Sequence, residues 1–217
     1  MGRLLIVSNR LPVNVTRTDG QLHFNRNVGG LATGMASLSR SDQLWIGWPG
    51  LAGDTLGEQD KAEITGKLEQ LQYRPVHLSS HDIRDYYYGF CNKTVWPLFH
   101  YFPQYCVFEP SLWQSYENVN RLFCEAVLQV AEPDDTIWIH DYQLMLLPQM
   151  IRQQLPEAQI GFFLHIPFPS FELLRLLPWR MELLDGLLGA DLLGFHEYDY
   201  VRHFLSSAHR IAGHEHT

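Results

Sequence analysis

The 217-residue sequence has few cysteines, no long apolar run and no excess of basic residues. Its three cysteines, Cys91, Cys106 and Cys124, are an odd number without C-x-x-C spacing. That pattern argues against a disulfide framework or a structural zinc site and favours a reducing compartment. No segment is long enough for a membrane span, and the N-terminal apolar run is too short for a signal peptide. We therefore expect a cytoplasmic protein with no membrane partner.

The charge balance excludes a further class of protein. A net charge of −8 disfavours a general nucleic-acid binder, which normally presents a basic face. It does not exclude an anionic small-molecule substrate, because a few well-placed arginines can bind phosphate inside an acidic protein.

Two sequence signatures of cofactor and metal sites are also missing. Gly29 and Gly30 open a predicted helix, and their backbone N–H groups are suited to bind an anion. They are not part of a G-x-G-x-x-G motif, so a dinucleotide cofactor is not supported, and a tight turn is the plainer interpretation. The histidines near the C-terminus have no cysteine partners and no H-E-x-x-H spacing. We expect neither a cofactor nor a metal.

What the sequence does contain is a set of continuous apolar runs typical of buried parallel strands. These runs are 3–8, 43–48, 136–140 and 159–166, with 190–195 as a fifth and 73–79 as a weaker candidate because it contains Pro75. Helical patterns lie between and after them, at 58–72, 111–131, 143–154, 171–188 and 197–211. The alternation predicts a doubly wound, mostly parallel, Rossmann-like α/β layer.

Polar residues lie at the carboxyl ends of several of these predicted strands. They are Ser8, Asn9 and Arg10, then Trp48, His140 and Asp141, His165 and His196. Ligands of open α/β sheets bind beyond the carboxyl ends of the strands, so these residues together predict a site.

Taken singly, each of these residues has an ordinary interpretation. Arg10 could bind a phosphate or lie on the surface, and the local sequence favours neither. Asp141 could accept hydrogen bonds from sugar hydroxyls, but its local sequence favours an N-cap of the following helix. His165 and His140 are each more typical of packed histidines than of catalytic ones. The aromatic stretch 85–101 is mostly core, although such rings also stack on sugars.

Seven sequence blocks, taken together, are far more specific. In chain order they are IVSNRLPV, GGLATG, WIGWPG, YYYGFCNKTVWPLFHY, IWIHDYQLMLLPQMIR, GFFLHIPFPSFELLRLLPWR and DLLGFHEYDYVRHFL. In content and order they resemble the trehalose-6-phosphate synthases, which are retaining glycosyltransferases built from two Rossmann-like halves (the GT-B type). The resemblance implies that residues 1–217 form the N-terminal, acceptor-binding half, and that the C-terminal donor-binding domain is absent from this chain.

The resemblance also implies roles for individual residues. Arg10 matches the arginine that binds the acceptor phosphate, and Trp48, Tyr87 and Trp96 match aromatic acceptor contacts. Asp141 matches the aspartate that binds acceptor hydroxyls, which shifts the preference away from a helix cap. His165 matches the histidine between donor sugar and acceptor, so Asp141 and His165 are the catalytic candidates, with no nucleophile assigned. Gly29 and Gly30 match a glycine pair at the donor phosphate.

The activity that the resemblance implies is transfer of glucose from a nucleotide sugar, usually UDP-glucose, to glucose-6-phosphate with retention, giving trehalose-6-phosphate. The chain alone is expected to be inactive, because the donor-binding groups belong to the second half. One alternative is a sister transferase with another phosphorylated acceptor, such as glycerol-3-phosphate. Another is a non-catalytic relative that senses sugar phosphate or mediates assembly. Whether the protein forms a homo-oligomer stays open.

Overall fold

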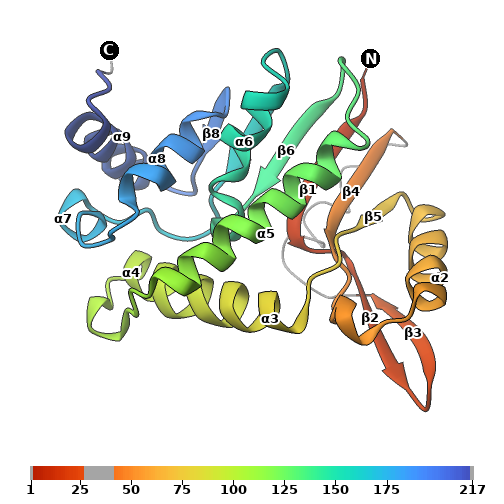
Figure 1. Ribbon diagram of the computed structural model, residues 1–217. Helices are drawn as coiled ribbons and strands as arrows, with labels where there is room; N and C mark the ends of the chain where they lie inside the picture. The colour runs from red at the N-terminus through yellow and green to blue at the C-terminus, as the bar shows by residue number, and fades with distance from the viewer. Residues whose placement is uncertain (1, 27–41, 216–217) are drawn as a thin grey trace.

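The computed structural model describes residues 2–26 and 42–215, and its core is a six-stranded parallel sheet (Figure 1). The strand order is β5-β4-β1-β6-β7-β8. The strands are β1 (Leu4–Arg10), β4 (Gln43–Trp48), β5 (Tyr73–Pro75), β6 (Thr136–His140), β7 (Gln159–Phe163) and β8 (Leu192–Gly194). The predicted fold class is confirmed, and each predicted strand is present, although several are shorter than expected.

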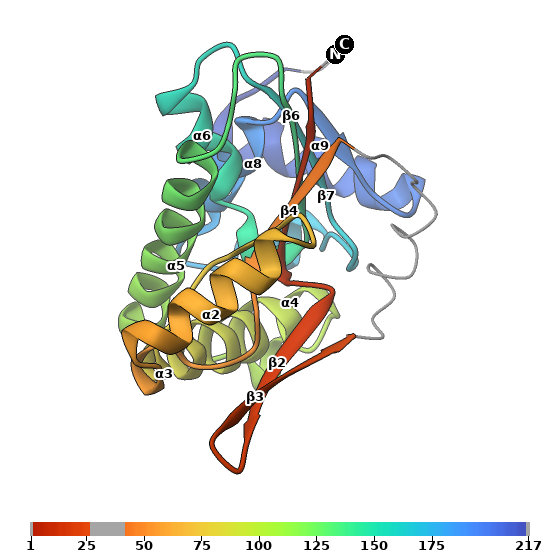
Figure 2. The same ribbon diagram turned by 90° about the vertical axis from the view of Figure 1, so that its right-hand side faces the viewer.

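Both faces of the sheet are buried, which explains why the strand sequences are continuously apolar. Along β1, Leu5 and Val7 face a large core on one side, while Leu4 and Ile6 face a smaller core on the other. Successive strand side chains alternate between faces, so each face needs its own apolar set. Figures 1 and 2 show helix α5 crossing one face, with α2 and the β2–β3 hairpin at the β5 edge.

The described helices fill the connections between the strands. The α-helices are α2 (Glu58–Glu69), α3 (Ser80–Asp82), α4 (Trp96–Phe99), α5 (Pro110–Leu128), α6 (Leu147–Gln154), α7 (Phe171–Leu174), α8 (Arg180–Leu188) and α9 (Tyr198–Ala212). The others are the short 3-10 turns η1 (Gly53–Thr55), η3 (Pro103–Tyr105) and η4 (Tyr142–Leu144), and the π-helix η2 (Ile83–Val95). None of the helices in the described part of the chain is long and apolar enough to cross a membrane.

Three features differ from the sequence prediction. The expected helix 171–188 is wrong as a single element, because Pro178 interrupts it and separates α7 from α8. The expected helix 143–154 begins only at Leu147, after the turn η4. An antiparallel hairpin, β2 (Val13–Thr18) with β3 (Gln21–Arg26), was not predicted. Its Asp-Gly turn, with φ of 50° at Asp19 and 78° at Gly20, is the signal that could have found it.

The π-helix η2 is the least expected element. Its buried residues recur at four- and five-residue steps, which include Tyr86, Phe90, Cys91 and Val95. This wider period lets one long aromatic segment pack against α5, where the ring centroids of Phe90 and Tyr116 are 4.7 Å apart. The π-helix is a rare element, and where it occurs it often lies at a functional site.

Tyr116 of α5 connects this core to the turn after β6. Its hydroxyl donates to the Tyr142 carbonyl at 2.8 Å and accepts from the Met145 N–H at 3.0 Å, and its side chain is fully buried. Both partners lie in or directly after η4, so this one hydroxyl holds the backbone that follows β6.

We predict that Tyr116→Phe lowers the free energy of unfolding by about 1–3 kcal/mol, because it leaves a buried N–H and a buried C=O without a partner. Urea denaturation measures this difference. Tyr198→Phe is the matched control, since Tyr198 is 76% exposed and its change should have almost no effect. Equal effects of the two substitutions would contradict the structural role of the Tyr116 hydroxyl.

Candidate functional site

The carboxyl ends of the central strands bring the predicted site residues to one edge of the sheet. Arg10 ends β1 and is paired in register with Trp48, the last residue of β4. Asp141 follows β6 directly, and β6 is the other neighbour of β1. His165 lies two residues beyond β7, which pairs with β6. Parallel strands present their carboxyl ends at the same edge, so these residues lie together as expected, and their role as a shared site stays a prediction.

We call this group the strand-end cluster. It comprises Arg10, Trp48, Tyr87, Trp96, His140, Asp141, His165 and His196, contributed by strand ends and by η2 and α4. Gly29 and Gly30, the predicted donor-side glycines, lie outside the described residues.

Arg10 lies over an aromatic ring. Its guanidinium carbon is 4.2 Å from the centroid of the Trp48 ring, which is a cation–π contact. Trp48 is buried and its Nε1 donates to the Leu51 carbonyl at 2.8 Å, so the ring is a fixed platform. Arg10 has no carboxylate partner among the residues that the structure describes. The positive charge is therefore available to an external anion.

Gly50 makes room for this arginine. Its φ of +111° is a conformation that favours glycine. A Cβ at this position would also lie 2.1 Å from Asn14 Oδ1 and 3.2 Å from Arg10 Nη1. The glycine of the WIGWPG block is thus explained by close packing of the turn against Arg10.

Tyr87 and Trp96 flank the cluster from η2 and α4. The Tyr87 ring is 6.4 Å from the Trp48 ring, centroid to centroid. Trp96 is 44% exposed, stacks on His100 at 4.0 Å and lies 5.6 Å from the Tyr142 ring. Trp96 therefore presents an accessible aromatic face beside the residue that follows Asp141, an arrangement on which a sugar ring can stack.

A buried hydrogen bond ties the arginine side of the cluster to the aspartate side. The Tyr86 hydroxyl donates to Asn9 Oδ1 at 3.0 Å, next to Arg10, and also approaches the Gln143 carbonyl at 3.4 Å, beyond Asp141. Neither Tyr86 nor Asn9 was singled out as a functional residue on its own. A polar residue at a strand end and a tyrosine beside Tyr87 were the available signals.

The backbone of Asp141 is strained. Its φ of 77° and ψ of 168° lie in a region that is almost restricted to glycine. Asp141 occupies the N-cap position of η4, but its side chain makes no capping hydrogen bond, so the cap that the local sequence alone favoured is not formed. Instead Asp141 Oδ1 accepts from the backbone N–H of His165 at 3.2 Å. The strain aims the carboxylate toward the end of the neighbouring strand rather than along its own helix.

Burial also perturbs the ionisation of Asp141. It raises the pKa of the carboxyl to about 6, although the backbone N–H groups of Tyr142 and His165 and the nearby His196 and His100 act in the opposite direction. A carboxylate held in this way retains unsatisfied acceptor capacity, and hydroxyl groups of a ligand can supply the missing donors.

Two histidines meet beside Asp141. His140 Nδ1 lies 3.1 Å from His165 Nε2, and the His196 ring is 5.5 Å from the His165 ring. Burial lowers the pKa of His140 to about 3 and that of His165 to about 4. Both imidazoles are therefore neutral at pH 7. The expectation that His140 is only a packed residue is incomplete, because its ring contacts a predicted site residue directly.

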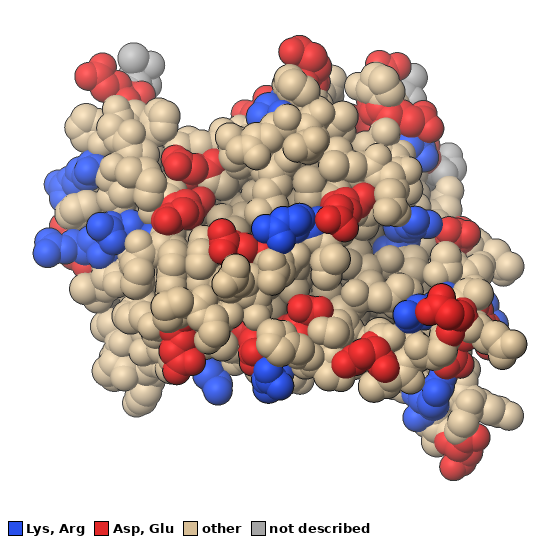
Figure 3. Space-filling view, in the orientation of Figure 1, with Lys and Arg blue, Asp and Glu red and all other residues tan. Residues whose placement is uncertain are grey.

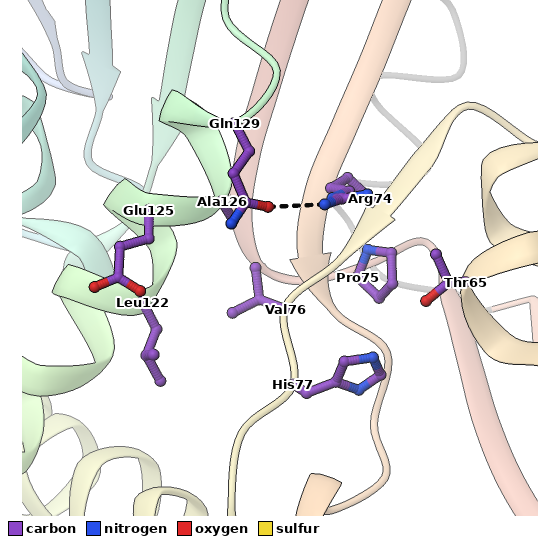
Figure 4. Close-up of a pocket in the computed structure, with 9 residues that line it drawn as sticks. All are labelled: Thr65, Arg74, Pro75, Val76, His77, Leu122, Glu125, Ala126 and Gln129. Carbon is purple, nitrogen blue, oxygen red and sulfur yellow. Dashed lines mark hydrogen bonds between the residues drawn. The ribbon is translucent and has the colours of Figure 1, made fainter. Parts of the chain in front are cut away.

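Two other hollows lie away from the strand-end cluster. One, of about 270 Å³, is lined by residues of α2, β5 and α5 (Figure 4). Its Arg74 already donates to Glu69 at 3.1 Å and to Gln129 at 2.8 Å. The second, of about 580 Å³, lies among α7, α8 and α9, near the left edge of Figure 3, where basic side chains gather. Neither shares a residue with the strand-end cluster. No set of metal-ligating side chains is found among residues 2–26 and 42–215.

The sequence family model for "Glycosyltransferase family 20" matches residues 2–217. The chain belongs to glycosyltransferase family 20. A relative of this family, "Alpha,alpha-trehalose-phosphate synthase [UDP-forming] 1" of Aspergillus niger, is 46% identical over 219 residues, covering 97% of this chain and 42% of the relative.

Two solved structures have the same fold. The N-terminal domain of Candida albicans trehalose-6-phosphate phosphatase superposes with a TM-score of 0.84 at 36% identity, over 100% of this chain and 45% of that chain. A UDP-forming alpha,alpha-trehalose-phosphate synthase from Burkholderia xenovorans in complex with glucose-6-phosphate superposes with a TM-score of 0.75 at 31% identity. That match covers 94% of this chain and 42% of the other. The family 20 chain described here thus spans less than half the length of these relatives.

The strain at Asp141 makes a prediction about two substitutions that both remove the carboxylate. Asp141→Gly should be more stable than Asp141→Ala by about 1 kcal/mol, because only glycine adopts this backbone conformation without steric cost. Urea denaturation of the two variants gives the difference. A more stable alanine variant would mean that the backbone at this position is not strained.

The raised pKa of Asp141 predicts a pH-dependent stability difference. Between an unfolded pKa of 3.8 and a folded pKa of about 6, the native state binds more protons, so the wild type loses stability as the pH rises. Asp141→Asn does not titrate. Its free energy of unfolding relative to wild type should therefore increase by about 2–3 kcal/mol from pH 4 to pH 8. Denaturant unfolding at several pH values measures this. A difference that stays constant with pH would contradict the buried, titrating carboxylate.

Proposed function

We propose that this chain is the acceptor-binding half of a retaining glycosyltransferase that makes trehalose-6-phosphate from a nucleotide-glucose, UDP-glucose in particular, and glucose-6-phosphate. The observation that carries the proposal is the arrangement of Arg10 and Asp141. An arginine that has no carboxylate partner among the described residues ends β1, and a half-buried carboxylate directly follows the neighbouring strand β6. Aromatic rings lie near both.

This arrangement suits a sugar phosphate, which has an anionic end and a hydroxyl-rich ring. Arg10 binds the phosphate through charge-assisted hydrogen bonds, and its position over Trp48 fixes the direction of the guanidinium. Asp141 accepts hydrogen bonds from ring hydroxyls. Trp96 and Tyr87 cover the apolar faces of the sugar. Acidic groups elsewhere on the surface do not prevent phosphate binding, because the guanidinium of Arg10 acts on the phosphate at short range.

Catalysis in this proposal depends on placing the two sugars in reacting geometry and on stabilising the leaving diphosphate. Asp141 and His165 contact the acceptor and the donor sugar, respectively, and neither serves as a nucleophile. Gly29 and Gly30 bind the donor phosphate through their backbone N–H groups. The remaining donor-binding groups come from the second half of such an enzyme, so these 217 residues alone bind acceptor weakly and transfer no glucose.

The names of the relatives support this reading over a sister transferase. The Aspergillus niger relative is a UDP-forming trehalose-phosphate synthase, and the Burkholderia xenovorans structure contains glucose-6-phosphate. A cluster that combines an arginine for an anion, an aspartate for hydroxyl groups and aromatic rings for stacking favours a ligand with a sugar ring over glycerol-3-phosphate.

Calorimetric titration of the chain with glucose-6-phosphate tests the proposal. We expect binding that Arg10→Ala weakens at least about tenfold, since a hydrogen-bonded charge pair contributes about 1.5–3 kcal/mol. Arg74→Ala, in the hollow beside β5, is the matched control and should leave the affinity unchanged.

Titration with glycerol-3-phosphate distinguishes the phosphate-binding part of the cluster from its hydroxyl-binding part. Arg10→Ala should weaken both ligands, whereas Asp141→Asn should weaken only glucose-6-phosphate, which has the ring hydroxyls. Tighter binding of glycerol-3-phosphate would favour the sister transferase. No binding by a folded chain, or glucosyl transfer by the chain alone, would each contradict the proposal as stated.

A further inference from the structure

His140 is a buried polar residue at the cluster for which the proposed function gives no role. It is the last residue of β6, it is 1% exposed, and its Nδ1 lies 3.1 Å from Nε2 of His165. The two rings are nearly parallel, with an interplanar angle of 28° and centroids 5.3 Å apart. The parallel pairing of β6 with β7 brings the two residues together, since His140 pairs with Phe163, two residues before His165.

The contact is a hydrogen bond between two neutral rings. With both imidazoles uncharged at pH 7, one nitrogen of the pair holds a hydrogen and the other offers a lone pair. A single hydrogen bond of this kind fixes where the proton lies on both rings. It also restricts rotation of the His165 ring.

Two observations decide the direction of this hydrogen bond. His140 Nε2 is buried and has no partner in the described part of the chain. If His140 accepted the bond, Nε2 would be a buried N–H without an acceptor, which folded proteins rarely leave. The Asp141 carboxylate accepts from the backbone N–H of His165, so its negative charge lies on the backbone side of the His165 ring. That charge favours a proton on His165 Nδ1, the ring nitrogen nearer the backbone. Both point to His140 as the donor.

We infer that His140 is a positioning residue: it donates from Nδ1 to Nε2 of His165 and thereby holds the His165 proton on Nδ1. His165 then offers an uncharged N–H donor to a ligand oxygen. No residue in the described ranges forms a hydrogen bond with that Nδ1. In terms of the proposed function, on which this part of the inference rests, the acceptor of that hydrogen bond is a hydroxyl oxygen of a sugar bound at the strand-end cluster.

Imidazole nitrogen-15 NMR of the full chain tests the inference without any ligand. A protonated ring nitrogen and a bare one have well-separated chemical shifts, so the spectrum reports the tautomer of each histidine. We expect His165 to show a protonated Nδ1 and a bare Nε2. We also expect a through-hydrogen-bond coupling between His140 Nδ1 and His165 Nε2, which needs no variant. A proton on His165 Nε2 would overturn the inference.

Two substitutions separate a positioning role from simple packing. The amide nitrogen of His140→Asn is placed like Nδ1 and can still donate, so His165 should keep its single tautomer. His140→Phe fills the space but cannot donate, so the His165 shifts should move to an average of both tautomers. His77→Asn, outside the cluster, is the control and should change nothing at His165. An unchanged His165 tautomer in His140→Phe would refute the positioning role.

Addition of glucose-6-phosphate then distinguishes failure of this inference from failure of the proposed function. If the tautomer depends on His140 but no ligand binds, the positioning role stands and the proposed function fails. If the ligand binds equally to wild type and His140→Phe with unchanged His165 shifts, the proposed function stands and the positioning role fails.

Discussion

The pairing of β1 with both of its neighbours is the constraint on which the site depends. Because β1 lies between β4 and β6, its register fixes Arg10 beside Trp48 on one side and sets the end of β6, hence Asp141, on the other. A slip of one residue in a strand would exchange the faces of its side chains, so each core would receive the side chains that are packed in the other. The two buried faces of the sheet therefore keep the charged groups at the sheet edge in place.

The same architecture leaves a positive charge uncompensated within the cluster of an acidic protein. The guanidinium of Arg10 is placed by contact with an indole ring rather than with a carboxylate, so its charge is not neutralised within the cluster. The opposite charge, on Asp141, directly follows the adjacent strand β6. Separate placement of the two signs on neighbouring strands makes the cluster complementary to a molecule that is anionic at one end and hydroxyl-rich at the other.

Much of this could be predicted from the sequence because parallel strands buried on both faces have a simple signature. The runs 3–8, 43–48 and 136–140 each have a continuous apolar centre. The residues at their carboxyl ends, namely Ser8 to Arg10, Trp48, and His140 with Asp141, marked the edge of the sheet. The π-helix η2 could not be found in this way, since its four- and five-residue period matches neither a strand nor an α-helix. The contact between His140 and His165 depends on strand register, and local patterns do not contain it. The positive φ of Asp141 was hidden because an aspartate occupies a conformation that normally signals glycine.

That last feature has an evolutionary consequence. An aspartate codon becomes a glycine codon by a single nucleotide change, and at position 141 glycine is the residue that the backbone prefers. Mutation can thus remove the carboxylate while relieving local strain, which offsets part of the loss of its hydrogen bond to the His165 N–H. Glycine here costs less folding stability than another small residue would, and the domain is one nucleotide change away from losing this carboxylate.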